Sequence, residues 1–102
     1  MADKITKLSQ AIRLGATFRP QCHFDVFRRG GSCALGAAYE VVTGIGNEVD
    51  YTHGPGFFKA MGERFGYERD EWDRIVDRVV AWNDGDQLSR EEIAQKLELQ
   101  GL

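Results

Sequence analysis

The sequence contains few of the residues that cross-link small proteins or bind metals. Its 102 residues include two cysteines, two histidines and two prolines, and no C-x-x-C pair occurs. Cys22, His23, Cys33 and His53 together offer two sulfurs and two imidazoles, but their spacing does not match the paired ligands of a zinc site. Two isolated thiols also do not form the disulfide framework of a secreted domain. We therefore expect reduced thiols, and we predict no metal site and no cofactor.

Long apolar runs are also missing, which leaves no candidate membrane span. The first residues, MADKITK, are polar and charged, unlike a secretory signal. Hydrophobic residues make up 42% and charged residues 28% of the chain, as in ordinary globular proteins. We expect a single cytoplasmic domain over residues 1–102.

Positive charge is scarce in the second part of the chain. Residues 1–46 carry a net charge of +3, whereas residues 47–102 carry −6. An acidic surface does not follow a phosphate backbone, so nucleic acid is disfavoured as a partner. The acidic half suits a basic protein surface instead. One alternative is an acidic mimic that binds a nucleic-acid-binding protein.

Apolar periodicity predicts about five helices. In the first, over about 4–15, the residues Ile5, Leu8 and Ile12 share one face. The clearest helix runs from about 71 to 83, with Asp70 as its N-cap. Its apolar stripe consists of Trp72, Ile75, Val76, Val79 and Val80. Continuing this stripe predicts that Asn83 lies at the buried end of the helix, where its amide satisfies backbone groups.

Capping signals define two further helices. Ser89 and Glu92 form a capping box, and Leu88 with Ile93 adds a hydrophobic staple. Ser32 is the expected N-cap of a helix over about 33–43 that Gly44 ends. Its small residues predict close contact with another backbone, because Gly36 costs about 1 kcal/mol of helix propensity relative to alanine.

The remaining segments are less regular. Phe18, Phe24 and Phe27 lie in residues 17–31, and we expect all three to pack on the core. Residues 44–56 form the longest loop. Near its end, Pro55 is placed as the first residue of a helical segment that Gly66 stops. The predicted fold is all-α, a compact single domain of about five helices with an irregular aromatic-rich segment after the first. A short strand pair in 17–31 or 44–54 is the alternative.

Several motifs together resemble a group of small bacterial and phage proteins. They are LSQAIRLGA (8–16), PQ (20–21), SCALGAAYEV (32–41), WND (82–84) and SREEIAQKL (89–97). The resemblance covers most of the chain and implies a helical layout with a bacterial or mobile-element origin. Many members of that group carry a C-P-x-C pair that this sequence lacks, so no metal role is implied. The group has no assigned activity, and the resemblance therefore supplies no chemistry.

A thiol enzyme is the alternative that the cysteines raise. Cys33, His53 and Asn83 or Asp84 follow the order of nucleophile, base and orienting group found in papain-like hydrolases. A thiol at a helix N-terminus also gains thiolate character from the helix dipole. However, no local motif around Cys33 matches a protease signature. We interpret Cys33 as a small buried residue and favour a protein that is not an enzyme.

Three aromatic side chains and two arginines are the predicted binding residues. Tyr51, Phe57 and Trp82 are candidates for an exposed patch that contacts a partner, and Arg28 and Arg29 form the basic cluster. The prediction for function is a small helical interaction module whose partner is another protein. A second copy of the chain is one candidate for this partner, in which case the protein is a homodimer.

Overall fold

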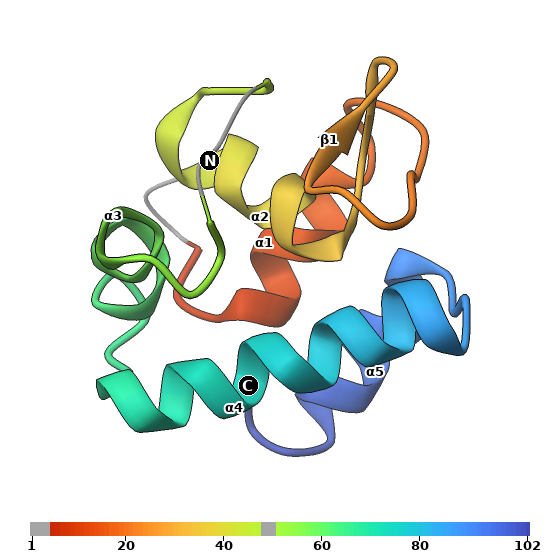
Figure 1. The fold of residues 1–102 in the computed structure, drawn as a ribbon. Helices are drawn as coiled ribbons and strands as arrows, with labels where there is room; N and C mark the ends of the chain where they lie inside the picture. Colours follow the sequence, from red (N-terminus) through yellow and green to blue (C-terminus); the bar gives the residue numbers. More distant parts are fainter. Residues whose placement is uncertain (1–4, 48–50) are drawn as a thin grey trace.

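The computed structural model describes residues 5–47 and 51–102, in which helices are joined by irregular segments and one small hairpin (Figure 1). The helical elements, with η marking a π-helical turn, are α1 Leu8–Gly15, α2 Ala34–Thr43, α3 Pro55–Phe57, η2 Phe58–Gly62, α4 Arg69–Val80, η3 Ala81–Gly85 and α5 Arg90–Glu98. The α1 helix packs against α2 and α5, and α4 packs against α2. Within the described residues, no helix is long and apolar enough to span a membrane.

The α4 helix confirms the strongest periodicity of the sequence. Its buried residues are Trp72, Ile75, Val76 and Val79. Two details of the prediction were wrong. The N-cap is Glu68 rather than Asp70, and Val80 is 37% exposed. Eight residues along a helix rotate a side chain by roughly 80°, so Val80 lies at the edge of the stripe that begins at Trp72.

Close backbone contact surrounds the small residues of α2, as the sequence predicts. A methyl group on Gly36 would overlap the carbonyl oxygen of Val26, and one on Gly15 would overlap the carbonyl of Ala37. In each case the neighbour is backbone, which cannot rotate away as a side chain can. Gly44 ends α2 in the left-handed region with φ of 77°, which glycine adopts without steric cost. The first residue of the predicted helix over 4–15 lies outside the described residues.

A two-stranded antiparallel hairpin shows that the fold is mostly helical rather than all-α. Strand β1, Phe27–Arg28, pairs with β2, Gly31–Ser32. The connecting residues Arg29 and Gly30 have φ of 51° and 82°, and positive φ at both positions is the mark of a type I′ turn. The alternative of a short strand pair in 17–31 is therefore close to what the structure shows, since the hairpin ends one residue beyond that range.

Ser32 belongs to this hairpin and is not the N-cap of α2. Its N–H donates to the Pro20 carbonyl at 2.9 Å, and its carbonyl accepts from the Cys22 N–H at 3.0 Å. Because these bonds hold Ser32 as a strand residue, the cap falls to Cys33, whose Sγ accepts from the Gly36 N–H at 3.4 Å.

Helix α5 begins with the predicted capping box and a buried arginine. The Ser89 N–H donates to Glu92 Oε1 at 2.9 Å, and the Glu92 N–H donates to Ser89 Oγ at 3.1 Å. Arg90 is buried, which lowers the pKa of its guanidinium. It donates to Ser32 Oγ at 2.9 Å and to the Arg19 carbonyl at 2.8 Å. Arg90 therefore joins α5 to the hairpin and to the segment after α1.

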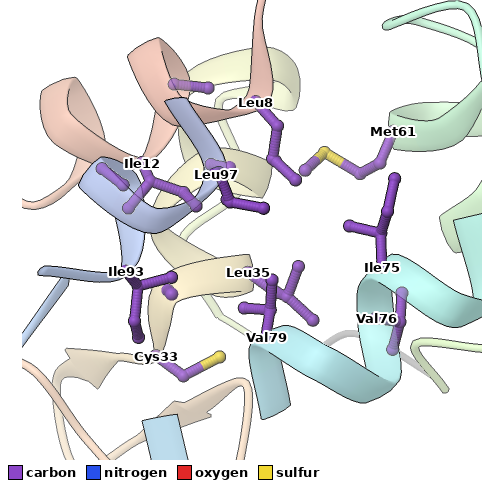
Figure 2. Close-up of a cluster of buried hydrophobic side chains, with 14 of the residues drawn as sticks. Leu8, Ile12, Cys33, Leu35, Met61, Ile75, Val76, Val79, Ile93 and Leu97 are labelled. Atoms are coloured by element: carbon purple, nitrogen blue, oxygen red, sulfur yellow. The ribbon is translucent and has the colours of Figure 1, made fainter. Parts of the chain in front are cut away.

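The core fills the space between the longer helices (Figure 2). It includes Leu8, Ile12, Leu35, Met61, Ile75, Val76, Val79, Ile93 and Leu97. Phe57 also belongs to this core, so the prediction of an exposed Phe57 was wrong. Its ring stacks on Tyr39 with 5.1 Å between centroids and lies 6.2 Å from Trp72. A helix of three residues has no apolar period from which its buried side could be identified.

Candidate functional site

A small open pocket lies where the start of α2 meets the end of α4, and we call it the α2–α4 pocket. Its volume is about 170 Å³. Four segments of the chain contribute its lining, which consists of Phe24, Asp25, Val26, Cys33, Leu35, Thr52, Val79, Val80, Asn83 and Asp84. Pockets for drug-sized ligands measure roughly 300–1,000 Å³. The α2–α4 pocket is therefore closer in size to a single side chain than to an organic cofactor.

Asn83 is the polar centre that holds these segments together. It is buried in η3, and its Oδ1 accepts from Gln21 Nε2 at 2.9 Å and from the Ala34 N–H at 3.1 Å. Its Nδ2 donates to the Cys22 carbonyl at 3.0 Å and to Asp84 Oδ1 at 2.8 Å. The predicted role of this amide at the buried end of the helix is confirmed. One side chain thus positions the N-terminus of α2 and the segment that leads to Phe24.

Phe24 stands at the rim of the pocket in an unusual backbone conformation. Its φ is 70° and it is 66% exposed, so the expectation that it packs on the core was wrong. The left-handed region costs a non-glycine residue roughly 1–2 kcal/mol. Two contacts hold the turn: the Phe24 N–H donates to Asp84 Oδ1 at 2.9 Å, and the Cys22 thiol donates to the Asp25 carbonyl at 3.3 Å.

The other two phenylalanines of this segment, Phe18 and Phe27, differ in how far they are buried. Phe18 is 48% exposed, which also contradicts the expectation. Phe27 is half-buried and packs edge-on against Tyr39 with 6.4 Å between ring centroids. Tyr39 in turn packs against the buried core, so Phe27 lies next to the core without being part of it.

Cys33 lines the pocket but is 7% exposed, at the edge of the core (Figure 2). Burial raises the pKa of its thiol to about 12, and the opposing effect of the hydrogen bond from the Gly36 N–H is smaller. The charge of Asp84 raises this pKa further. Desolvation thus outweighs the favourable dipole at the start of α2. The interpretation of Cys33 as a buried residue is confirmed.

We predict that native Cys33 resists alkylation by iodoacetamide at pH 8. A pKa near 12 leaves about a thousandfold less thiolate than an ordinary thiol has at this pH. Mass spectrometry of modified peptides would follow the rate in native buffer and in urea. The unfolded chain is the control, since both cysteines should then react. Native modification of Cys33 at the unfolded rate would contradict the prediction.

His53 contacts carboxylates rather than Cys33. Its Nδ1 lies 3.0 Å from Asp73 Oδ1 and its Nε2 lies 2.9 Å from Asp77 Oδ1. The contact with His53 is the main reason that the pKa of Asp73 is lowered. Arg69 also donates to the His53 carbonyl. Both ring nitrogens thus fasten the segment before α3 to α4, and the predicted order of Cys33, His53 and Asn83 is not assembled as a triad.

The remaining predicted binding residues lie outside the pocket lining. Tyr51 is 65% exposed and its ring lies 5.5 Å from that of His53. Trp82 is half-buried, with Lys96 Nζ 5.7 Å from its ring centroid. Of these two aromatic side chains, Tyr51 is the one that stands open to a partner.

Arg28 and Arg29 are exposed on the hairpin. They line a second pocket of about 290 Å³ together with Arg19. Arg19 is bound to Glu40 by two hydrogen bonds of 2.9 and 2.8 Å, whereas Arg28 Nε lies 3.8 Å from Asp25 Oδ2. Within the described part of the chain, no group of three or more His, Cys, Asp or Glu residues could hold a metal ion.

Phe24 and Val80 are the rim residues that the sequence analysis missed. Both belong to apolar patterns that predict burial. Phe24 is turned outward by a tertiary contact with Asp84, which no local signal indicates. Val80 is exposed because helix rotation places it at the edge of the apolar stripe, which its spacing from Trp72 could have indicated. A comparison of this chain with protein families, curated proteins and solved structures found no match. The motif resemblance therefore stays a prediction.

Proposed function

We propose that this chain is a small cytoplasmic binding module that contacts another protein through the α2–α4 pocket and its exposed rim. The observation that carries this proposal is Phe24, an aromatic side chain that is largely exposed and held in a costly conformation. Because the Phe24 ring is largely exposed, it adds little to the stability of the fold. A partner that covers the ring would gain the free energy of removing it from water.

The surroundings of Phe24 support the same proposal. Val80, on the rim, is also exposed, and Leu35 and Val79 contribute apolar lining. Central aromatic anchors beside small pockets are typical of residues that dominate protein–protein affinity. The volume of about 170 Å³ suits one side chain of a partner better than a cofactor.

The thiol-enzyme alternative has less support. The raised pKa of Cys33 disfavours the thiolate, and the ring nitrogens of His53 are engaged by Asp73 and Asp77. The acidic-mimic alternative rests on the charge of residues 47–102 alone. A partner that binds through the rim would not need the whole acidic surface.

Phe24→Ala should weaken capture of the partner by at least about 30-fold, the effect of losing a 2 kcal/mol anchor. The experiment immobilises the wild-type chain and two variants, exposes them to lysate of the source cell, and quantifies retained proteins by mass spectrometry. Light scattering after size exclusion tests whether the partner is a second copy.

Phe18→Ala is the matched control, because Phe18 is also exposed but does not line the pocket. The proposal predicts a protein retained by the wild type and by Phe18→Ala but lost from Phe24→Ala. It is contradicted if Phe24→Ala retains the same proteins at the same level. A wild-type chain that retains nothing and remains a monomer would contradict it equally.

A further inference from the structure

We infer that the segment bound at the α2–α4 pocket is a cationic one, in which a branched aliphatic side chain lies next to a lysine or arginine. This inference rests on the proposed function and adds the chemistry of the partner. It follows from an apolar floor combined with a negatively charged rim.

The charged residues that line the pocket, among those the structure describes, have one sign. They are Asp25 and Asp84, and no lysine, arginine or histidine of residues 5–47 and 51–102 belongs to the lining. The ion pair that Asp25 makes with Arg28 is weak, since Arg28 Nε lies 3.8 Å from Asp25 Oδ2 and both side chains are about half exposed. A rim of this kind attracts a cation and repels an acidic segment.

Asp84 is already oriented for a ligand. Within residues 5–47 and 51–102, both hydrogen bonds to its carboxylate end on Oδ1, from the Phe24 N–H at 2.9 Å and from Asn83 Nδ2 at 2.8 Å. These two bonds hold the carboxylate in place, and neither of their donors carries a positive charge. Its charge reaches the interior, where it contributes to raising the pKa of the Cys33 thiol. A lysine or arginine of a partner would supply the missing positive charge.

The pocket itself favours an aliphatic group. Leu35 and Val79 are almost fully buried residues at its lining, and Val26 and Val80 add further apolar surface. A volume of about 170 Å³ corresponds to about five or six water molecules. Releasing that water to seat one leucine-sized side chain is favourable, while the adjacent cation pairs at the rim.

The test begins with a library of random seven-residue peptides displayed on phage. Selection uses the immobilised wild-type chain, after peptides that bind the Phe24→Ala variant have been removed. The inference predicts enrichment of peptides that carry leucine, isoleucine or valine beside lysine or arginine. Enrichment of neutral or acidic peptides would overturn it while leaving the proposed function intact. If no peptide prefers the wild type, the inference is overturned, and the lysate capture and light scattering described above decide the proposed function separately.

The most enriched peptide is then synthesised and titrated into the wild type and two variants by fluorescence polarisation. Asp84→Asn keeps an acceptor oxygen for the Phe24 and Asn83 contacts but removes the charge, so we expect affinity to fall about tenfold. Asp86→Asn is the matched control, exposed and outside the pocket lining, and should change affinity by less than twofold. Equal affinities for wild type and Asp84→Asn would overturn the inference.

Discussion

Arg90→Met should lower the free energy of unfolding by about 3 kcal/mol. Methionine keeps most of the apolar stem but leaves the Ser32 hydroxyl and the carbonyls of Ala16 and Arg19 without their donor. The Ser32 carbonyl also loses Arg90 but keeps its bond from the Cys22 N–H. An unsatisfied buried polar group costs roughly 1–3 kcal/mol. The Ala16 and Arg19 contacts are only partly buried and regain water, so the loss is less than the sum of three such penalties.

Desolvation acts in the opposite direction but does not reverse this result. Burial lowers the pKa of Arg90, so removing the guanidinium returns part of the cost of keeping a charge away from water. The Ser32 hydroxyl remains buried in the variant, however, and the loss of its donor together with the weaker carbonyl contacts outweighs that gain. A loss of about 3 kcal/mol is a large share of the roughly 5–15 kcal/mol that holds a domain of this size folded.

Urea unfolding followed by circular dichroism would measure this change, with Arg13→Met as the matched control. Arg13 donates to Glu91 and Glu98, both at 2.7 Å, but on the surface. Exposed ion pairs contribute about 0–1 kcal/mol each, so this control, which breaks two of them, should lose less than about 2 kcal/mol. Equal losses in the two variants, with unchanged urea dependence, would show that the carbonyl contacts of Arg90 are dispensable.

The two arginines also show what the sequence can and cannot predict. Helix α5 is predictable because the Ser89–Glu92 capping box is local, involving residues three positions apart. The burial of Arg90 is not local, since its acceptors lie 58 to 74 residues away. Arginine next to a capping serine looks like an exposed helix residue. Only the meeting of α5 with the hairpin changes that environment.

The candidate site likewise has parts that local sequence signals predict and parts that depend on distant residues. The burial of Asn83 follows from extending the apolar stripe of α4, and the burial of Cys33 follows from its small neighbours. The outward position of Phe24 depends on Asp84, 60 residues away, and on a positive φ that phenylalanine does not signal. The position of His53 depends on Asp73 and Asp77. The scaffold beneath the pocket was therefore accessible to sequence analysis, and its rim was not.

Gly36→Ala should destabilise the fold by about 3 kcal/mol, although it improves helix propensity. The propensity gain is about 1 kcal/mol. Against it, the new methyl group would overlap the carbonyl oxygen of Val26, which also accepts a hydrogen bond from the Cys33 N–H at 3.0 Å. Overpacking costs roughly 1–3 kcal/mol, and breaking the Cys33 contact adds about 1–3 kcal/mol. The steric and hydrogen-bond costs therefore exceed the gain.

Gly56→Ala is the matched control, because Gly56 also lies in a helical segment but has open space where the methyl group would be placed. It should be neutral or stabilising by up to about 1 kcal/mol. Urea unfolding of both variants measures the difference, and a Gly36→Ala chain as stable as the wild type would contradict the prediction. Val26 also lines the α2–α4 pocket. Displacing its backbone should therefore weaken binding of the selected peptide under conditions where the variant is still folded, since the glycine contact that packs α2 also shapes the pocket wall.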